Sequence, residues 1–233
     1  NTQFFPFLLF IIFGSAVLLQ LIYYWFIFNR LASFKQRDPA QGGASCTVPV
    51  SVVICAHNES RHLKENLPLI LEQEYTKYEV VVVDHSSDDD THYLLRNFQE
   101  QFPHLKVVTI KEDLNFFTGK KFPLSIGIKS AQYEHVILTD ADCRPSSSHW
   151  LSLMQSAFNK EKEIVLGYSP YTTEKGFLNR LIRFDTLHIA MQYLGFALAG
   201  IPYMGVGRNL AYKKQLFYRN KGFISHYRIR SGD

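Results

Sequence analysis

Five short, continuous runs of apolar and β-branched residues set the strongest limit on how this chain can fold. Runs that lack an alternating polar pattern are typical of strands buried on both faces of a largely parallel sheet. The predicted strands are residues 50–55, 80–83, 107–110, 136–139 and 164–168, and the predicted helices between them are residues 59–72, 90–101, 119–131 and 148–159. This succession of β-α-β units predicts an α/β fold with a mostly parallel central sheet.

The composition is that of a folded protein. The 233 residues are 46% hydrophobic and 20% charged, which suits one domain with a substantial core. The net charge is +4 and the basic residues are scattered, so nucleic acid is not an expected partner. The three cysteines, Cys46, Cys55 and Cys143, lack the spacing of a metal site. An odd number of cysteines favours a reducing compartment over a disulfide framework.

The N-terminal residues 4–28 contain no charged side chain and are dense in Phe, Leu and Ile. As a helix they would be about 37 Å long, enough to cross a hydrocarbon core of about 30 Å. The start has no basic segment of the kind that opens a cleaved signal peptide. The run ends in Tyr23, Tyr24 and Trp25, which are typical of a membrane interface. We therefore predict one transmembrane helix over residues 4–28.

Basic residues follow this predicted span and none precedes it. Arg30, Lys35 and Arg37 come directly after it, so the positive-inside rule places the rest of the chain in the cytoplasm. Residues 38–45 are rich in Pro, Gly and Ala and predict a linker. The predicted organisation is a single-pass protein of the cell membrane, with a transmembrane helix at 4–28, a juxtamembrane linker at 29–47 and a cytoplasmic domain at 48–233.

Residues 177–199 predict a long helix that is apolar on most faces. Arg180, Arg183, Asp185 and His188 interrupt it, which argues against a second membrane span. Two interpretations stay open, a helix that lies against the membrane and a helix packed across the core of the domain.

Polar residues follow three of the predicted strands, at residues 57–59, 84–88 and 140–142. In open parallel sheets ligands bind beyond the carboxyl ends of the strands, so these clusters predict one shared site. Asp140 and Asp142 are one residue apart and would point the same way from an extended strand. They can then hold one divalent cation and, through it, an anionic ligand. The alternative is a turn in which each Asp bonds its own backbone.

Three segments in this order resemble family 2 glycosyltransferases of the GT-A fold: VVICAHNE at 52–59, VVVDHSSDDDT at 81–91 and TDAD at 139–142. The resemblance covers nearly all of residues 48–233. It implies a nucleotide-diphospho-sugar transferase fold, and an inverting transfer of a sugar from a nucleotide-sugar donor. The expected cation on the donor diphosphate is Mn²⁺ or Mg²⁺, because both suit hard oxygen ligands.

The resemblance also implies roles for individual acidic residues. Asp84 matches the residue that accepts a hydrogen bond from the imide N–H of the base, which favours uracil over cytosine and hence a UDP-sugar. Asp142 is the expected direct metal ligand, and Asp140 the expected contact to ribose or to metal-bound water. Glu59 is expected among the donor contacts. The acidic residues 88–90 are interpreted as a helix N-cap.

Two further segments resemble parts of the family's donor site. In GKKFPLSIGI at 119–128, Lys120 would lie near the diphosphate at a helix start, although an exposed surface lysine is an equal interpretation. Pro123 and Ser125 depart from the family's usual Ala and Asn. Residues 203–212 resemble the glycine-containing loop beside the donor sugar, which makes Gly207 a predicted donor contact. The alternative is a turn into an edge strand at residues 209–212.

Inversion needs a general base that takes the proton of the acceptor hydroxyl. The family supplies a carboxylate after the glycine loop, and Asp233, the last residue, fits best. We therefore expect Asp233 to be the catalytic base and the sequence to be C-terminally incomplete. The predicted acceptor is lipid-linked or a polysaccharide.

Other interpretations of the chain remain open. One is a non-catalytic, membrane-anchored module that binds a nucleotide sugar or a partner protein. Another is a nucleotidyltransferase. A dehydrogenase is disfavoured, because no Gly-x-Gly-x-x-Gly follows the first predicted strand.

Overall fold

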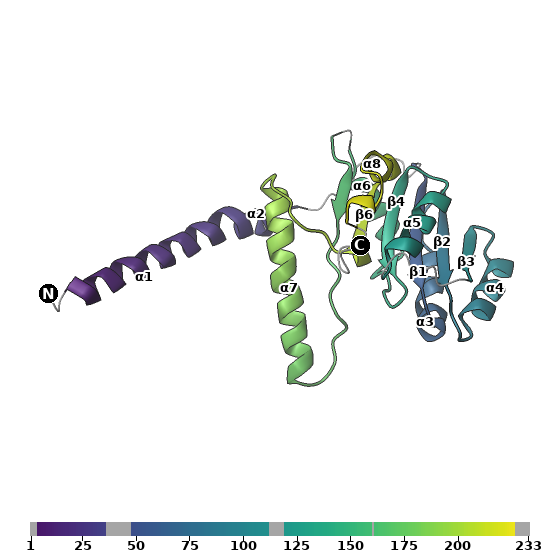
Figure 1. Ribbon diagram of the computed structural model, residues 1–233, viewed down its shortest axis with the longest axis horizontal. Helices are drawn as coiled ribbons and strands as arrows, with labels where there is room; N and C mark the ends of the chain where they lie inside the picture. The colour runs from purple at the N-terminus through teal and green to yellow at the C-terminus, as the bar shows by residue number, and fades with distance from the viewer. Residues whose placement is uncertain (1–3, 36–47, 112–118, 160, 227–233) are drawn as a thin grey trace. The chain divides into compact units, whose positions relative to one another are not determined.

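The structure, a computed structural model, describes residues 4–35, 48–111, 119–159 and 161–226 (Figure 1). The described residues form two compact units, which are treated separately below. The helical unit contains residues 4–35 and Tyr168–Gly205, and the sheet unit contains residues 48–167 and 206–226. Residues 168–205, which the sequence places inside one continuous domain, therefore cluster with the N-terminal helices.

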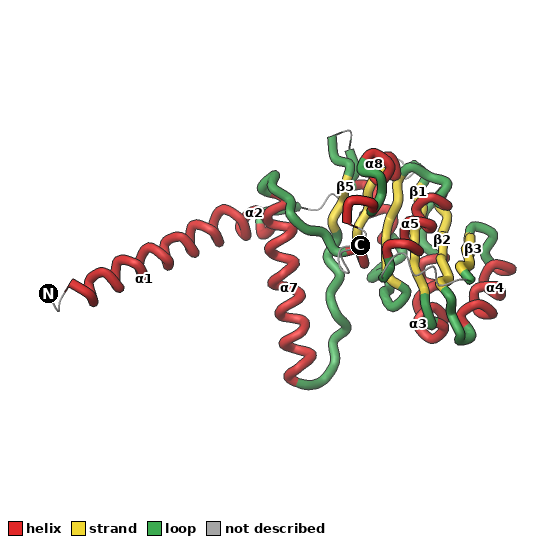
Figure 2. Tube along the Cα trace, in the orientation of Figure 1, coloured by secondary structure: helices red, strands yellow, loops and turns green. Residues whose placement is uncertain are grey.

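The sheet unit is built on a six-stranded sheet with the strand order β3-β2-β1-β4-β6-β5 (Figure 2). The parallel strands are β1 (Val50–Ala56), β2 (Tyr78–His85), β3 (Leu105–Ile110) and β4 (His135–Asp140). Two shorter strands follow, β5 (Ile164–Leu166) and β6 (Leu210–Lys213), and β6 pairs antiparallel with both β4 and β5. The predicted α/β fold with a mostly parallel sheet is confirmed.

Helices cover both faces of this sheet. One face packs against α3 (Ser60–Leu71), α4 (Thr91–Gln101) and α6 (Trp150–Ser156), and the other against α5 (Lys121–Ser130) and α8 (Lys214–Arg219). The strands divide between these layers with a period of two, so Val52 and Ile54 join one core and Val53 the other. Gly127 lets α5 approach closely, because a Cβ there would lie 2.5 Å from Val53 Cγ1.

The sequence predicted these strands and crossover helices with ends that differ by a few residues. The prediction of an edge strand at residues 209–212 was wrong, because β6 lies between β4 and β5. Its residues 210–212 make ladder pairs on both sides. A local pattern of four residues cannot show which distant strands will flank it, and this insertion is antiparallel to its neighbours.

The helical unit joins the N-terminal segment to one long helix. α1 (Phe4–Tyr23) continues through a π-helical turn, η1 (Tyr24–Phe28), into α2 (Asn29–Ala32), and the second partner is α7 (Phe177–Leu198). Among the described residues one helical segment, Phe5–Ala32, is long and apolar enough to cross a membrane. This agrees with the N-terminal apolar helix predicted from the sequence, and such a helix could anchor the chain in a bilayer.

The C-terminal half of α7 packs against η1. A Cβ at Gly195 would lie 2.9 Å from Ile27 Cγ2, so only glycine permits this approach. The Phe28 and His188 rings meet edge to face at 6.2 Å. Only Ala190, Tyr193 and Gly195 of α7 are buried. The interpretation of α7 as a helix in the core of the domain was therefore wrong.

Candidate active site at the carboxyl ends of the strands

The strand order reverses direction between β1 and β4. From β1 the chain passes to β2 and then β3 on one side, and α5 then returns it to β4 on the other side of β1. Open α/β sheets bind ligands in the crevice at such a switch point. A pocket lies there, and the residues that line it include Cys55, Lys120, Leu124, Asp140 and Gly207. The fold thus brings together three of the predicted site residues, Lys120, Asp140 and Gly207, from distant parts of the sequence.

Lys120 and Asp140 form an ion pair in this pocket, with 3.0 Å between Nζ and Oδ1. Lys120 lies directly before α5, and Asp140 is the last residue of β4. Both side chains are partly exposed, so the pair contributes at most about 1 kcal/mol to stability. An ammonium group held at a helix start beside the switch point is placed where an anionic ligand would bind.

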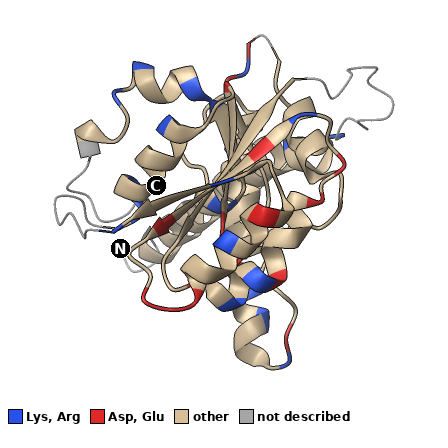
Figure 3. Cartoon of the chain, turned by 90° about the vertical axis from the view of Figure 1, so that its right-hand side faces the viewer, with Lys and Arg blue, Asp and Glu red and all other residues tan. Residues whose placement is uncertain are grey.

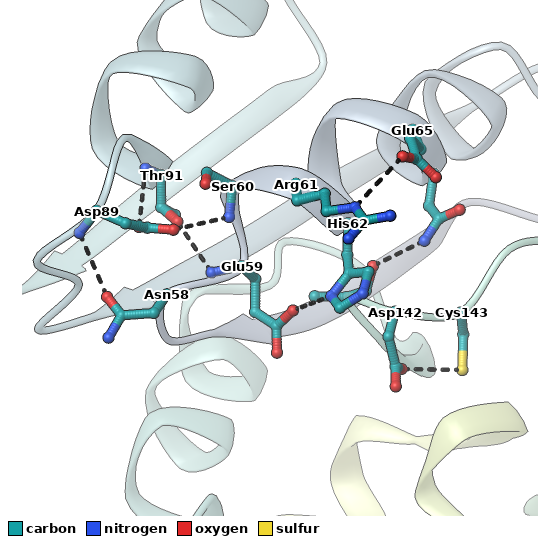
Figure 4. A network of polar contacts seen from close by, with 12 residues as sticks. Asn58, Glu59, Ser60, Arg61, His62, Glu65, Asp89, Thr91, Asp142 and Cys143 are labelled. Atoms are coloured by element: carbon teal, nitrogen blue, oxygen red, sulfur yellow. Dashed lines mark hydrogen bonds and ion pairs between the residues drawn. The ribbon is translucent and has the colours of Figure 1, made fainter.

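Asp140, Asp142 and Cys143 bring their side-chain ligand atoms within 4.8 Å of one another. The Cys143 thiol donates a hydrogen bond to Asp142 Oδ1 at 3.4 Å (Figure 4). Burial raises the pKa of Cys143 to about 12, and the charges of Asp142 and Asp140 add to the shift. The thiol is therefore protonated at neutral pH. The two carboxylates are the groups suited to a hard cation such as Mn²⁺ or Mg²⁺.

The turn that carries these carboxylates is held by main-chain contacts. The Cys143 N–H donates to Asp140 O at 3.1 Å. From α3, the buried Asn66 donates its Nδ2–H to Ala141 O at 3.2 Å. Asn66 is therefore a positioning residue for the Asp140–Asp142 turn. No sequence pattern indicates this role, because Asn66 is 75 residues away from Ala141 along the chain.

Asp84 ends the apolar run of β2 and is almost fully buried, with 1% of its surface exposed. Its Oδ1 has no hydrogen-bond partner among the described residues. Its Oδ2 lies 3.8 Å from His92 Nδ1, which is half exposed. A buried carboxylate oxygen without a donor is costly, by about 1–3 kcal/mol or more. A ligand N–H placed there would remove that cost.

The turn after β1 is tied to the turn after β2. Asn58 adopts the left-handed conformation (φ 57°), which Asn tolerates better than most residues, and its Oδ1 accepts a hydrogen bond from the Asp88 N–H at 2.8 Å. His57 Nδ1 donates to His85 O at 2.7 Å. Glu59 Oε2 contacts His62 Nδ1 at 2.6 Å (Figure 4). Neither Glu59 nor Asp84 is among the residues that line the pocket beside Lys120.

Asp89 binds the starts of two helices at once. Its Oδ1 accepts from the Thr91 N–H at 3.0 Å and its Oδ2 from the Ser60 N–H at 3.1 Å (Figure 4). Burial raises the pKa of Asp89, but hydrogen bonds from Thr91 and Ser60 outweigh it and lower the pKa to about 2. The N-cap predicted over residues 88–90 is thus made by Asp89. Asp90, which occupies the cap position of α4, makes no side-chain cap hydrogen bond.

Gly207 opens a short 3₁₀ turn, η2 (Gly207–Asn209), that leads into β6. Asn209 fixes this turn, because its Oδ1 accepts from Trp150 Nε1 at 3.1 Å and its main-chain oxygen accepts from the Gly167 N–H at 2.8 Å. Gly207 therefore reaches the pocket from a loop braced by α6 and β5. Asp233, the predicted base, lies outside the described residues.

Basic and acidic residues are interspersed over the coloured ribbon of Figure 3. The balance of charge at the switch point is different, since Lys120 pairs with Asp140 and a second carboxylate, that of Asp142, lies beside Asp140. Added positive charge, such as a cation on the carboxylates, would suit this group. A mostly parallel sheet with an acidic turn at its switch point agrees with the GT-A fold expected from the sequence.

Glycosyl transferase family 2 matches residues 51–221, and the chain belongs to this family. A probable glycosyltransferase, YdaM of Bacillus subtilis, is 27% identical over 229 residues, which are 92% of this chain and 53% of the relative. The poly-beta-1,6-N-acetyl-D-glucosamine synthase of Staphylococcus epidermidis is 33% identical over 125 residues, which are 52% of this chain and 28% of that protein. The chain thus spans about half, or less, of these curated relatives.

Solved structures agree on the fold. A mannosyltransferase of Pyrobaculum calidifontis, in complex with GDP-Man and Mn²⁺, aligns with a TM-score of 0.66 and 24% identity over 88% of this chain and 55% of its own. TarS of Staphylococcus aureus, in complex with UDP-GlcNAc, aligns with a TM-score of 0.55 and 20% identity over 75% of this chain and 48% of its own. The predicted GT-A fold is confirmed.

Proposed function

We propose that this glycosyltransferase moves a sugar, with inversion, from a nucleotide diphosphate sugar to a lipid-linked or polysaccharide acceptor at the cytoplasmic face of the membrane. The observation that carries the proposal is the meeting of Lys120, Asp140 and Gly207 in one pocket, with Asp142 beside it. A nucleotide-sugar ligand in two structural neighbours supports a donor of this class.

In this proposal the acidic turn and Lys120 share the donor diphosphate. Asp142, with Asp140, would hold Mn²⁺ or Mg²⁺, which neutralises charge on the departing nucleoside diphosphate. Lys120 then exchanges part of its contact with Asp140 for a phosphate oxygen. Asn66 keeps the Asp140–Asp142 turn in place during this exchange, because its hydrogen bond goes to the main chain. The Mn²⁺ bound by one structural neighbour is consistent with such a site.

Asp84 is proposed to select the base. Its unsatisfied Oδ1 would accept the N3–H of uracil, whereas cytosine presents an acceptor at that position. Guanine also carries a ring N–H, so UDP and GDP are the nucleotides to separate by experiment. Glu59 is proposed as a further donor contact. It would need to leave His62 to reach a ligand.

Asp233 is proposed as the base that takes the acceptor proton. The similarity to the poly-beta-1,6-N-acetyl-D-glucosamine synthase of Staphylococcus epidermidis supports a polysaccharide acceptor. The proposed organisation keeps a transmembrane helix at residues 4–28, a juxtamembrane segment at 29–47 and a cytoplasmic catalytic domain at 48–233. Within the helical unit, the contacts of η1 with α7 begin where that span is proposed to end.

Nucleotide binding by the purified, detergent-solubilised protein tests the donor site. UDP, UDP-GlcNAc, CDP and GDP-mannose are titrated with and without Mn²⁺. The expected result is metal-dependent binding of UDP and its sugar, and its loss in the variant Asp140→Ala/Asp142→Ala. The matched control is Glu100→Ala, which removes an exposed carboxylate from α4.

Tight binding of CDP would contradict the role of Asp84. Binding that ignores Mn²⁺, or that survives in the double variant, would contradict the metal site. Donor binding without sugar transfer to any acceptor, and without donor hydrolysis, would favour the non-catalytic module.

A further inference from the structure

The N-terminal half of α7 exposes large apolar side chains that no other described part of the helical unit covers. Phe177 is 81% exposed and Phe184 is 67% exposed, and Leu178 and Leu181 are at least half exposed. Phe177, Leu181 and Phe184 follow the i, i+4, i+7 spacing of one helical stripe. A contiguous apolar stripe on a protein surface marks an interaction site.

Two arginines flank this stripe. Arg180 and Arg183, with Tyr168, Pro170, Phe184 and Leu187, line an open hollow of about 250 Å³. All of these residues belong to the helical unit. A water molecule occupies about 30 Å³ of liquid, so the hollow has room for a phosphate group. The planar guanidinium group is the side chain best suited to bidentate phosphate binding.

The carboxylates of this segment leave both guanidinium groups available. Glu174 and Asp185 are the only acidic residues in Tyr168–Gly205, and neither forms an ion pair with Arg180 or Arg183 in the described chain. Asp185 is two residues from Arg183, and side chains at that spacing do not face each other on a helix. The hollow is therefore positively charged and lacks an internal counter-ion among the described residues.

The other half of α7 is joined to the apolar N-terminal helix. The rings of Tyr23 and Phe196 meet at 5.9 Å, and Ile27 fills the space that Gly195 leaves. Tyr23 to Trp25 mark the proposed membrane interface, and Arg30 follows them. The C-terminal half of the helix that carries the two arginines thus lies at the level at which lipid headgroups are expected.

We propose that the N-terminal half of α7 is a lipid-binding element at the membrane surface. Its apolar stripe enters the boundary between headgroups and acyl chains, and Arg180 and Arg183 bind the phosphate of an anionic phospholipid. The inference rests on the proposed membrane anchoring and on no part of the donor site. It assigns α7 a partner of stated chemistry, the anionic lipid surface, to which the span at residues 4–28 would tether it.

Hydrogen exchange of the whole protein, reconstituted into vesicles, tests this element. Vesicles of phosphatidylcholine alone are compared with vesicles that also contain phosphatidylglycerol. Peptides from α7 are expected to exchange more slowly with the anionic lipid. The double variant Arg180→Gln/Arg183→Gln should lose this difference, since each arginine near an anionic surface is worth roughly a fivefold shift in binding.

The control Arg61→Gln/Arg96→Gln removes the same charge from α3 and α4 and should behave as the parent. Exchange in β1 and β4 reports whether each variant is folded. UDP binding in the same vesicles separates a failure of this inference from a failure of the donor site, because only the latter would abolish nucleotide binding.

Four results would overturn the proposal. Equal protection in both vesicle types would exclude a role for the anionic lipid. Protection that persists in Arg180→Gln/Arg183→Gln would exclude a role for the two arginines. Protection that appears only after polyprenyl phosphate is added would assign the hollow to a lipid-linked acceptor instead. Protection that follows protein density in the membrane would assign the stripe to a second copy of the chain.

Discussion

The two units use apolar residues in opposite ways. In the sheet unit, β1 is sealed between α3 and α5, and its valines and Ile54 are buried. In the helical unit, the apolar residues of α1 and of the first half of α7 are mostly exposed. The sheet unit therefore contains the contacts that stabilise it. The helical unit does not cover this apolar surface itself, and its stability should depend on the surrounding lipid or detergent.

The largest effect is expected at the acidic turn of the sheet unit, on activity alone. Asp142→Asn should lower sugar transfer roughly a thousandfold, because a cation supplies several kcal/mol of transition-state stabilisation. Asp142 is exposed, so the free energy of unfolding should change by less than about 0.5 kcal/mol. Steady-state transfer and urea denaturation measure the two quantities. If the folded Asp142→Asn variant transfers sugar at the rate of the parent protein, Asp142 has no role in the site.

A matched pair of leucines compares the two units directly. Leu67→Ala, on the buried face of α3, should destabilise the protein by roughly 2–5 kcal/mol in any detergent. Leu181→Ala, half exposed on α7, should cost less than about 0.5 kcal/mol in detergent. Urea denaturation of both variants is the measurement. Equal losses would mean that the apolar surface of α7 is covered within the protein.

The turn held by Asn66 should show a smaller, mixed effect. Asn66→Ala removes the hydrogen bond to Ala141 O, so stability should fall by about 1 kcal/mol and Mn²⁺ affinity by roughly tenfold. Gln73→Ala is the control, because Gln73, which follows the C-terminus of α3, also donates to main-chain oxygens, those of Leu69 and Ser147. Calorimetric titration with Mn²⁺ measures the difference. The same Mn²⁺ affinity in both variants would leave Asn66 a purely structural residue.

The smallest effect is expected at Asp89 and depends on pH. Its folded pKa of about 2 lies below the ordinary value of about 3.9, so its charge stabilises the fold above pH 4. This contribution is lost as pH falls through the folded pKa. Asp89→Asn should cost about 1 kcal/mol at pH 7, allowing for solvent screening. Urea denaturation at several pH values should show the two proteins converging between pH 4 and pH 2, and a constant difference would contradict the assignment.

The sequence predicted most where structure follows from local pattern. The continuous runs became β1 to β4, because burial on both faces leaves a signature in every residue. The position of β6 and the packing of α7 did not follow, since both depend on segments far away in the chain. At the site, Asp140 and Lys120 were predicted from motifs. Asn66 was not, because nothing in its own neighbourhood indicates the turn that it supports.

The environment of Cys143 is another feature that the sequence alone did not predict. Its spacing from the other cysteines excluded a sulfur-rich metal site, yet its thiol lies beside Asp142. The signal in the sequence was its position immediately after the acidic pair. Burial and two neighbouring carboxylates then keep it protonated, which no count of cysteines can indicate.

Asp89 has a consequence for motion as well as for stability. One carboxylate accepts hydrogen bonds from the first N–H groups of both α3 and α4, so the N-termini of the two helices are held by the same side chain. A loop movement that admitted a nucleotide past the turn after β1 would have to carry the start of α4 with it, or release Asp89 altogether. The two turns should therefore fluctuate as one body, with equal amplitudes on the nanosecond timescale.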